Sequence, residues 1–214
     1  MAEYAGANGR TARSREKAAQ IRAAARRLFL ANGVSATSMN AITAEAGVSK
    51  QTVYAYFPSK EALLEDVLAE LVGRRAEQWQ ALHGDGAPLT STDELRGELT
   101  SLAEVIVEAL LQPDYVGTVR IVITEAARDP ALGERFANAV ARPVLAAVAA
   151  TLRRGQEGGA VRAEVSEDAP RLLVGALLTF VLLEGLLRPD LLERPPRARI
   201  DALVGDFLRG IASP

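Results

Sequence analysis

The stretch that decides the fold is residues 37–60, TSMNAITAEAGVSKQTVYAYFPSK. Ser38 and Ser49 carry side chains that cap helix N-termini, and each precedes a short run with apolar residues at helical spacing. Gly47 stands between the two runs, where a helix end favours a residue that can adopt positive φ. The pattern predicts two short helices joined by a tight turn, which is the helix-turn-helix arrangement.

The second short helix, predicted over residues 50–56, has the side chains of a DNA-recognition helix. Val53 and Phe57 fall four residues apart on its inner face, which leaves its polar side chains outside. Such a helix reads base edges from its first turn, and nearby hydroxyl and ammonium groups bind phosphates. Lys60 is predicted in the first turn of the following helix, where free N–H groups also attract phosphate. The predicted DNA contacts are Thr37, Ser38, Ser49, Lys50, Gln51, Thr52, Tyr54, Tyr56 and Lys60.

A longer array of residues surrounds this motif in a fixed order. It consists of Leu28-Phe29, Gly33, Thr37-Ser38, Ile42, Ala46-Gly47-Val48-Ser49-Lys50, Val53-Tyr54 and Tyr56-Phe57-Pro58-Ser59-Lys60-Glu61-Ala62-Leu63. Over residues 15–64 the array resembles the DNA-binding domain of the TetR family of bacterial repressors. Gln51 departs from the pattern, because relatives often carry Gly or Ala at this position. This difference affects which operator sequence the protein recognises, and it does not affect the expected fold.

Charge is distributed unevenly along the 214 residues. The net charge is −2 overall, yet residues 1–60 hold nine Lys and Arg against three Asp and Glu, a net of +6, and the remainder therefore carries −8. A basic N-terminal module on an acidic body indicates that only the first part meets a polyanion. The alternative is that the basic residues of the first helix form only a solvated face. These residues are Arg13, Arg15, Arg22, Arg26 and Arg27.

The remaining pattern predicts an all-α protein with about nine helices in two packed parts. We predict a flexible basic tail over 1–13, a helix-turn-helix domain over 14–60, and a helical effector-binding and dimerisation domain over 61–214. The first helix starts at Thr11 or Ser14 and ends near Ala31. The later helices are predicted at 59–82, 93–112, 114–128, 131–157 with a bend near Pro143, from 166 or 168 to 187, and 197–211.

The second part carries no catalytic signature, such as GxSxG or HExxH. The chain has no cysteine and a single histidine, His83, so we predict no metal, no cofactor and no enzymatic activity. No signal peptide is visible, and the apolar run 172–187 is short for a membrane span and contains Glu184. We predict a cytoplasmic protein without membrane contact. Glu125 and Glu184 lie in apolar helices, and their roles are open; for Glu184 the alternatives are an ion pair with an arginine across a dimer interface and a place in a pocket.

The TetR resemblance implies a homodimer formed by the last two helices, bound to a palindromic operator in double-stranded DNA. It also implies an effector pocket in the body, and the apolar helix faces suggest a small, mostly apolar effector. The expected function is a repressor that this effector releases from its operator. The residues expected to line the pocket are Trp79, Leu102, Ile106, Thr124, Val140, Val144 and Phe180.

Two alternatives stay open from the sequence. One is a DNA-binding regulator controlled by a protein partner without a small effector. The other is a helical small-molecule-binding protein or enzyme with a vestigial DNA-binding head, and the outward set on residues 50–60 argues against it. The sequence leaves open the effector, the operator, the regulated genes and the choice between repressor and activator.

Overall fold

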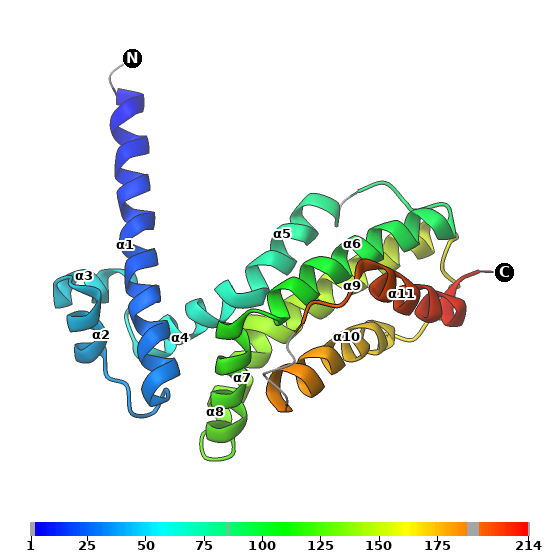
Figure 1. Ribbon diagram of the computed structural model, residues 1–214. Coiled ribbons are helices and arrows are strands. Elements are labelled where there is room, and N and C mark those ends of the chain that lie inside the picture. The colour runs from blue at the N-terminus through cyan, green and yellow to red at the C-terminus, as the bar shows by residue number, and fades with distance from the viewer. Residues whose placement is uncertain (1–2, 85, 188–192, 214) are drawn as a thin grey trace.

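The computed structural model describes residues 3–84, 86–187 and 193–213, with side chains from residue 13 onward except that of Glu184. These residues form helices and no β-strand, apart from one isolated bridge between Val161 and Ala212. Helical segments that follow each other without a break form nine rods in the described chain, which confirms the predicted all-α fold. Figure 1 shows a small N-terminal head beside an elongated helical body.

The head consists of α1 (Glu3–Asn32), α2 (Met39–Ala46) and α3 (Lys50–Tyr56), and the two short helices have the predicted bounds. The Ser38 side chain accepts a hydrogen bond from the Ala41 N–H, and the Ser49 side chain accepts one from the Thr52 N–H. Gly47 ends α2 at φ 62°, in the left-handed region that glycine adopts without strain. The head core includes Ile21, Phe29, Ile42, Val53 and Phe57, all buried.

The start of α1 differs from the prediction. The helix begins at Glu3, so the predicted start at Thr11 or Ser14 is wrong, while the flexibility of residues 1–13 stays a prediction. Gly6 and Gly9 suggested an irregular tail because each glycine disfavours a helix by about 1 kcal/mol. No proline interrupts residues 3–13, however, and extension of an existing helix adds one hydrogen bond per residue without a new nucleation step.

The body contains six further rods. The predicted helix over 59–82 is one rod with a π-helical segment inside it. The same holds for the rod over 130–157, where the π-helical segment η2 ends two residues before Pro143, the position of the predicted bend, and π-bulges are a known cause of helix bends. The bounds are α4 (Lys60–Leu68), η1 (Ala69–Gly73), α5 (Arg74–His83), α6 (Thr92–Leu110), α7 (Pro113–Ala126), α8 (Pro130–Phe136), η2 (Ala137–Ala141), α9 (Arg142–Glu157), α10 (Ala169–Phe180), η3 (Val181–Leu187) and α11 (Arg197–Ile211).

Helix α6 runs through the middle of the body and contacts α5, α9, α10 and α11 (Figure 1). Its buried side chains include Leu95, Leu99, Leu102 and Ile106, which repeat at three- and four-residue spacing as a core-facing stripe does. A bidentate ion pair between Arg96 and Asp201 fastens α11 to α6, with N–O distances of 3.0 and 2.5 Å. The body is therefore a bundle around α6.

The rod α10–η3 is longer than the apolar run 172–187, because it also includes Ala169, Pro170 and Arg171. Residues Ala169–Leu187 form 19 helical residues, which by length and composition alone suffice to cross a membrane. The argument that the run is too short therefore fails for the whole rod. About 41% of it lies buried in the protein, because α10 packs on α6, α9 and α11. Several of its leucines stay exposed on the isolated chain.

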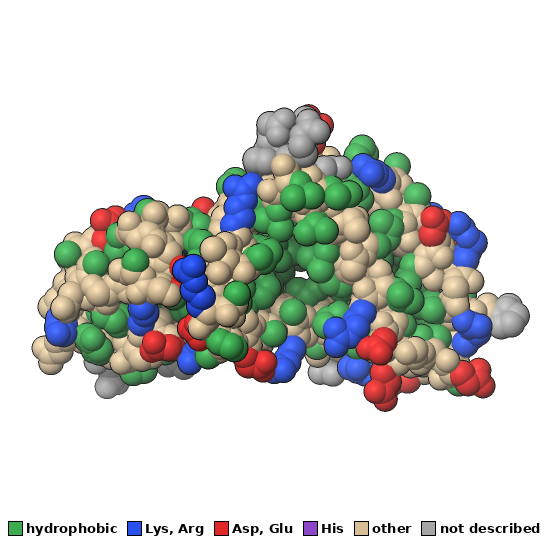
Figure 2. All heavy atoms as spheres, turned by 90° about the horizontal axis from the view of Figure 1, so that it is seen from below, with side chains coloured by type: hydrophobic (Ala, Val, Ile, Leu, Met, Phe, Trp, Pro, Cys, Tyr) green, Lys and Arg blue, Asp and Glu red, His purple; other side chains and the backbone are tan. Residues whose placement is uncertain are grey.

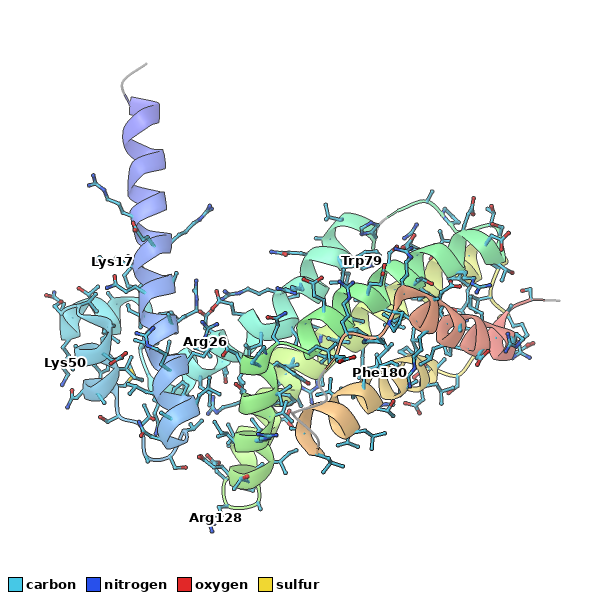
Figure 3. All side chains as sticks on the ribbon, viewed as in Figure 1. Lys17, Arg26, Lys50, Trp79, Arg128 and Phe180 are labelled. Carbon is cyan, nitrogen blue, oxygen red and sulfur yellow. The ribbon has the colours of Figure 1, made fainter. Side chains whose placement is uncertain are left out.

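Two arginines of α1 connect the head to the body. Arg22 lies 3.0 Å from Asp66 and 3.1 Å from Glu70, both on the α4–η1 rod. Arg26 lies 3.2 Å from Asp114 on α7. These two side chains therefore form ion pairs between the head and the body, and Figure 3 shows Arg26 between α1 and the body.

A carboxylate from the body holds the turn between α1 and α2. Glu125 of α7 accepts hydrogen bonds from the Val34 N–H at 3.0 Å, the Ser35 N–H at 3.1 Å and the Ser35 hydroxyl at 2.8 Å. Gly33 precedes these residues at φ 83°, and a Cβ atom there would lie 2.4 Å from a Glu125 oxygen. The turn therefore needs glycine both for its conformation and for the close approach of the carboxylate.

Lys60 holds the same turn through its carbonyl groups. Its ammonium group donates to the Val34 carbonyl at 2.9 Å and to the Thr37 carbonyl at 3.1 Å. The N–H groups of the turn are thus bonded to α7 and its carbonyls to α4. This arrangement fixes where α2 begins, and through α2 it fixes the orientation of α3.

Replacement of Glu125 by alanine should destabilise the protein. The substitution removes a charged acceptor from two backbone N–H groups and a hydroxyl, and the expected loss is about 1–3 kcal/mol in the free energy of unfolding. Thermal unfolding followed by circular dichroism measures it. Glu108→Ala is the matched control, because Glu108 is exposed and its carboxylate lies 3.8 Å from Arg75. A melting temperature lowered no more by Glu125→Ala than by the control would contradict this role.

Candidate nucleic-acid interface and internal cavity

Helix α3 presents three polar or aromatic side chains on its outer face. Lys50 and Gln51 are exposed in its first turn, and Tyr54 is 42% exposed one turn later. The Lys50 ammonium lies 5.7 Å from the centre of the Tyr54 ring, within range of a cation–π contact. Val53 faces inward and is fully buried. Figure 3 places Lys50 on the side of the head that is turned away from the body.

A shallow depression joins this face to the start of α2. Its rim includes Ser35, Ser38, Asn40, Lys50 and Tyr54. The first N–H groups of α2 have no intrahelical partner, and a helix N-terminus attracts phosphate oxygens. Asn40 was missed by the sequence analysis, which concentrated on α3. The signal that could have found it is an exposed polar residue in the first turn after the cap Ser38.

Several predicted DNA-contact residues are engaged within the head. Thr37 is only 3% exposed, and its hydroxyl donates to the Gly33 carbonyl at 2.7 Å. Ser38 and Ser49 cap helices through their hydroxyl oxygens. Thr37 and Ser38 border the depression, but the side chains of all three residues stabilise the head.

Three further predicted residues are also engaged. The Thr52 hydroxyl lies 2.8 Å from the Ser49 hydroxyl. Tyr56 is half-buried, with its ring centre 6.5 Å from that of Phe57. Lys60 borders the depression, but its ammonium group is bonded to two carbonyls of the α1–α2 turn. The outward residues of the predicted set are therefore Lys50, Gln51 and Tyr54.

Fewer basic side chains of the head are available to DNA than the count of Lys and Arg residues suggested. Arg22 and Arg26 are paired with acids of the body, and Arg27 lies 2.9 Å from Glu45 within the head. Lys50 has no acidic group within 4.0 Å in the described part of the chain. The cation beside α3 is therefore available to a phosphate or a base.

The body has a cavity of about 240 Å³ that lies between α6, α7, α8, η2, α9 and α10 and opens to the surface beside the exposed residues Arg171, Gly175 and Leu178 of α10. Leu110, Phe136, Val140, Val144 and Val174 supply most of its wall. Figure 2 shows a hollow with hydrophobic side chains around it on this face of the molecule. The volume lies just below the range of about 300–1,000 Å³ that is typical of ligand pockets.

The structure brings together only two of the seven residues predicted for the pocket, Val140 and Val144. Leu102, Ile106 and Phe180 are buried, and none of them lines the cavity. Helical periodicity predicts that a residue faces inward, but it does not specify which neighbouring element that residue meets. The remaining two predicted residues lie elsewhere.

Trp79 stacks on His83, with ring centres 4.0 Å apart, and its indole N–H is buried without a hydrogen-bond partner in the described chain. Thr124 is exposed, and its hydroxyl donates to the Arg120 carbonyl at 2.7 Å. Neither residue lines the cavity. Their role in binding an effector stays a prediction, which assigned inward faces to α5 and α7 from sequence spacing alone.

Two polar residues at the cavity were missed by the sequence analysis. Tyr115 is only 4% exposed, and its hydroxyl has no hydrogen-bond partner among the described residues. Burial raises the pKa of this phenol well above its ordinary value, so the hydroxyl stays protonated at physiological pH. Arg171 borders the cavity from α10, and its guanidinium lies 2.9 Å from Asp168 one turn earlier.

Comparison with known proteins agrees with this architecture. The sequence model of the tetR family of bacterial regulatory proteins matches residues 21–67. The model of the C-terminal domain of AefR-like transcriptional repressors matches residues 97–210. An uncharacterized HTH-type transcriptional regulator of Mycobacterium tuberculosis is 28% identical over 184 residues, which cover 85% of this chain and 81% of that protein.

Solved structures show the same fold. A proposed TetR-family transcriptional regulator from Mesorhizobium loti superposes with a TM-score of 0.71 at 28% identity, covering 94% of this chain and 99% of that one. A TetR family transcriptional regulator from Pseudomonas syringae gives 0.66 at 25% identity, covering 91% and 96%. The flavonoid-responsive regulator FrrA gives 0.64 at 27% identity, covering 92% and 97%. With one family model matching more than half of its length, the chain belongs to the TetR family of bacterial regulatory proteins.

Proposed function

We propose that the protein is a homodimeric repressor that binds a palindromic operator and that a small, mostly apolar effector releases it from DNA. It acts as a regulator rather than an enzyme, in the cytoplasm where its DNA lies. The observation that carries the DNA-binding part is the outer face of α3, where Lys50, Gln51 and Tyr54 project beside the start of α2. Side chains at the start of such a helix read base edges in the major groove.

The exposed leucines of the rod α10–η3 support the homodimer. Leu172 is 67% exposed, Leu183 55% and Leu187 67%, although each is a large apolar side chain. Contiguous apolar surface of this kind marks an interaction site in a soluble protein. A second copy of the same face covers it symmetrically and presents two heads to two half-sites of an operator.

The internal cavity and the α7 helix support control by a small molecule. Tyr115 at the start of α7 borders the cavity, and Glu125 near its end holds the α1–α2 turn of the head. Between them, Arg120 donates to the carbonyls of Gly185 and Leu186 in η3 at 3.2 and 3.1 Å. A ligand that shifts α7 thereby changes the placement of the head. A coupling free energy of about 1–3 kcal/mol changes operator affinity about 5–150-fold.

Binding to operator DNA tests the proposal directly. Fluorescence anisotropy with duplexes from the DNA flanking the protein's own gene, beside a scrambled duplex, should show preferential binding of two protomers per site. Specific binding should weaken steeply with salt, because phosphate contacts release counterions. Equal affinity for specific and scrambled duplexes at two salt concentrations would reduce the head to a non-specific basic surface.

Substitution of Gln51 by alanine should change sequence preference rather than overall binding. An amide can pair bidentately with adenine, and its loss should alter discrimination at one base pair by about 1–3 kcal/mol. The affinities of a set of single-base operator variants measure this change. Gln78→Ala on α5 is the matched control, because Gln78 is exposed on the body. If the Gln51→Ala variant ranks the operator variants by affinity as the wild-type protein does, Gln51 does not read a base.

Substitution of Leu172 and Leu183 by glutamate should convert the dimer to a monomer. The two carboxylates would be buried at the proposed interface without partners, which strongly disfavours association. Light scattering after size exclusion should then give the protomer mass of 22.8 kDa instead of twice that value. Leu82→Glu is the control, since Leu82 is 80% exposed at the end of α5. A wild-type mass for the double variant would place the interface elsewhere.

A further inference from the structure

The polar groups around the cavity determine which class of ligand it can bind. This inference rests on the proposed effector site. The wall is apolar except at Tyr115 and Arg171. Tyr115 packs on Phe136, with ring centres 6.4 Å apart, so its ring is fixed against the wall. Its hydroxyl has no hydrogen-bond partner in the described chain, and it is not among the fully buried unpaired atoms, so water reaches it in the empty cavity.

A ligand that fills the cavity takes this water away from the hydroxyl, and a buried hydroxyl left without a partner is unfavourable. Because the phenol stays protonated, it offers one hydrogen-bond donor to the cavity. A ligand oxygen that accepts from it recovers the lost interaction, whereas a pure hydrocarbon leaves the hydroxyl unsatisfied. The cavity therefore favours an apolar molecule with one acceptor.

Arg171 does not turn the cavity into a site for anions. Its guanidinium is paired with Asp168 at 2.9 Å, and both side chains are largely exposed. The pair carries no net charge, and the remaining wall is apolar apart from the neutral phenol. A carboxylate inside would lose part of its hydration and would compete with Asp168 for the guanidinium, with no second cation in the lining to compensate it.

The size of the cavity limits the ligand further. An apolar cavity of about 150 Å³ in another protein accommodates benzene. The 240 Å³ found in this protein leave room for such a ring with a short substituent, or for an aliphatic molecule of similar volume. Larger ligands would need the wall to open.

We propose that the cavity binds a small, neutral, mostly apolar molecule that carries one acceptor oxygen, such as a ketone, an ester or a lactone, and that this oxygen accepts a hydrogen bond from the Tyr115 hydroxyl. Tyr115 is thus the residue that selects such molecules over hydrocarbons of the same shape. The absence of an unpaired cation at the cavity in the described chain selects them over acids.

Three probes of nearly the same shape test this selection on the full-length protein. They are acetophenone, ethylbenzene and benzoate, which present a ketone, a hydrocarbon and a carboxylate on one ring. Isothermal titration calorimetry should rank acetophenone above ethylbenzene and benzoate last. Tyr115→Phe keeps the ring and removes the hydroxyl, so it should weaken acetophenone about two- to tenfold and leave ethylbenzene unchanged.

A second variant tests whether the probes bind in this cavity. Gly175 borders the cavity and a Cβ atom there would meet no other atom within 4 Å, so Gly175→Phe can obstruct the cavity without a clash at its Cβ position. It should weaken acetophenone and ethylbenzene together. Wild-type affinity for both probes in this variant would place them elsewhere and overturn the proposal.

The affinities of the three probes distinguish the role of the Tyr115 hydroxyl from the proposed effector function of the cavity. Equal affinities of acetophenone and ethylbenzene in the wild-type protein and in Tyr115→Phe would overturn the role of the hydroxyl while leaving an effector cavity in place. Tightest binding of benzoate would overturn the choice of a neutral ligand. Failure of all three probes to bind would overturn both the ligand class and the cavity as an effector site, while leaving operator binding untouched.

Discussion

The structure depends on the carboxylate of Glu125, which reaches from the body to the turn that begins the helix-turn-helix. It accepts three hydrogen bonds from Val34 and Ser35, and Lys60 holds the carbonyls of the same turn. Hydrogen bonds to charged groups are stronger than neutral ones, so this contact resists small displacements. The direction of α3, and with it the DNA-binding face, follows from where this turn is held.

Helix α7 connects the regions that a ligand-controlled regulator has to join. Over 14 residues it borders the cavity through Tyr115, contacts η3 through Arg120 and holds the head through Glu125. A helix of this length spans about 20 Å at 1.5 Å per residue and moves largely as a rigid rod. Under the proposed function, a ligand that shifts the start of α7 also displaces its end, and the displacement reaches the head without a long chain of side chains.

The local elements could be predicted from the sequence because their causes are local. Ser38, Gly47 and Ser49 fix the bounds of α2 and α3 through caps and a left-handed turn residue, and the structure has those bounds. The long-range contacts were not predictable in the same way. The spacing of apolar residues gives the inward face of a helix, but Val140 and Val144 line the cavity while Leu102 and Ile106 of α6 are buried in the core without lining it.

The sequence by itself determined the helical class, the helix-turn-helix and its outward residues Lys50 and Gln51, because these depend on capping, turn geometry and short-range periodicity. The tertiary structure alone decided the roles of Glu125, Lys60 and Tyr115. Each is a polar side chain on an amphipathic helix, and its partner or lack of a partner depends on residues far along the chain: 91 residues separate Glu125 from Val34. Such a pairing is set by how the rods pack against each other, and no local rule specifies that packing.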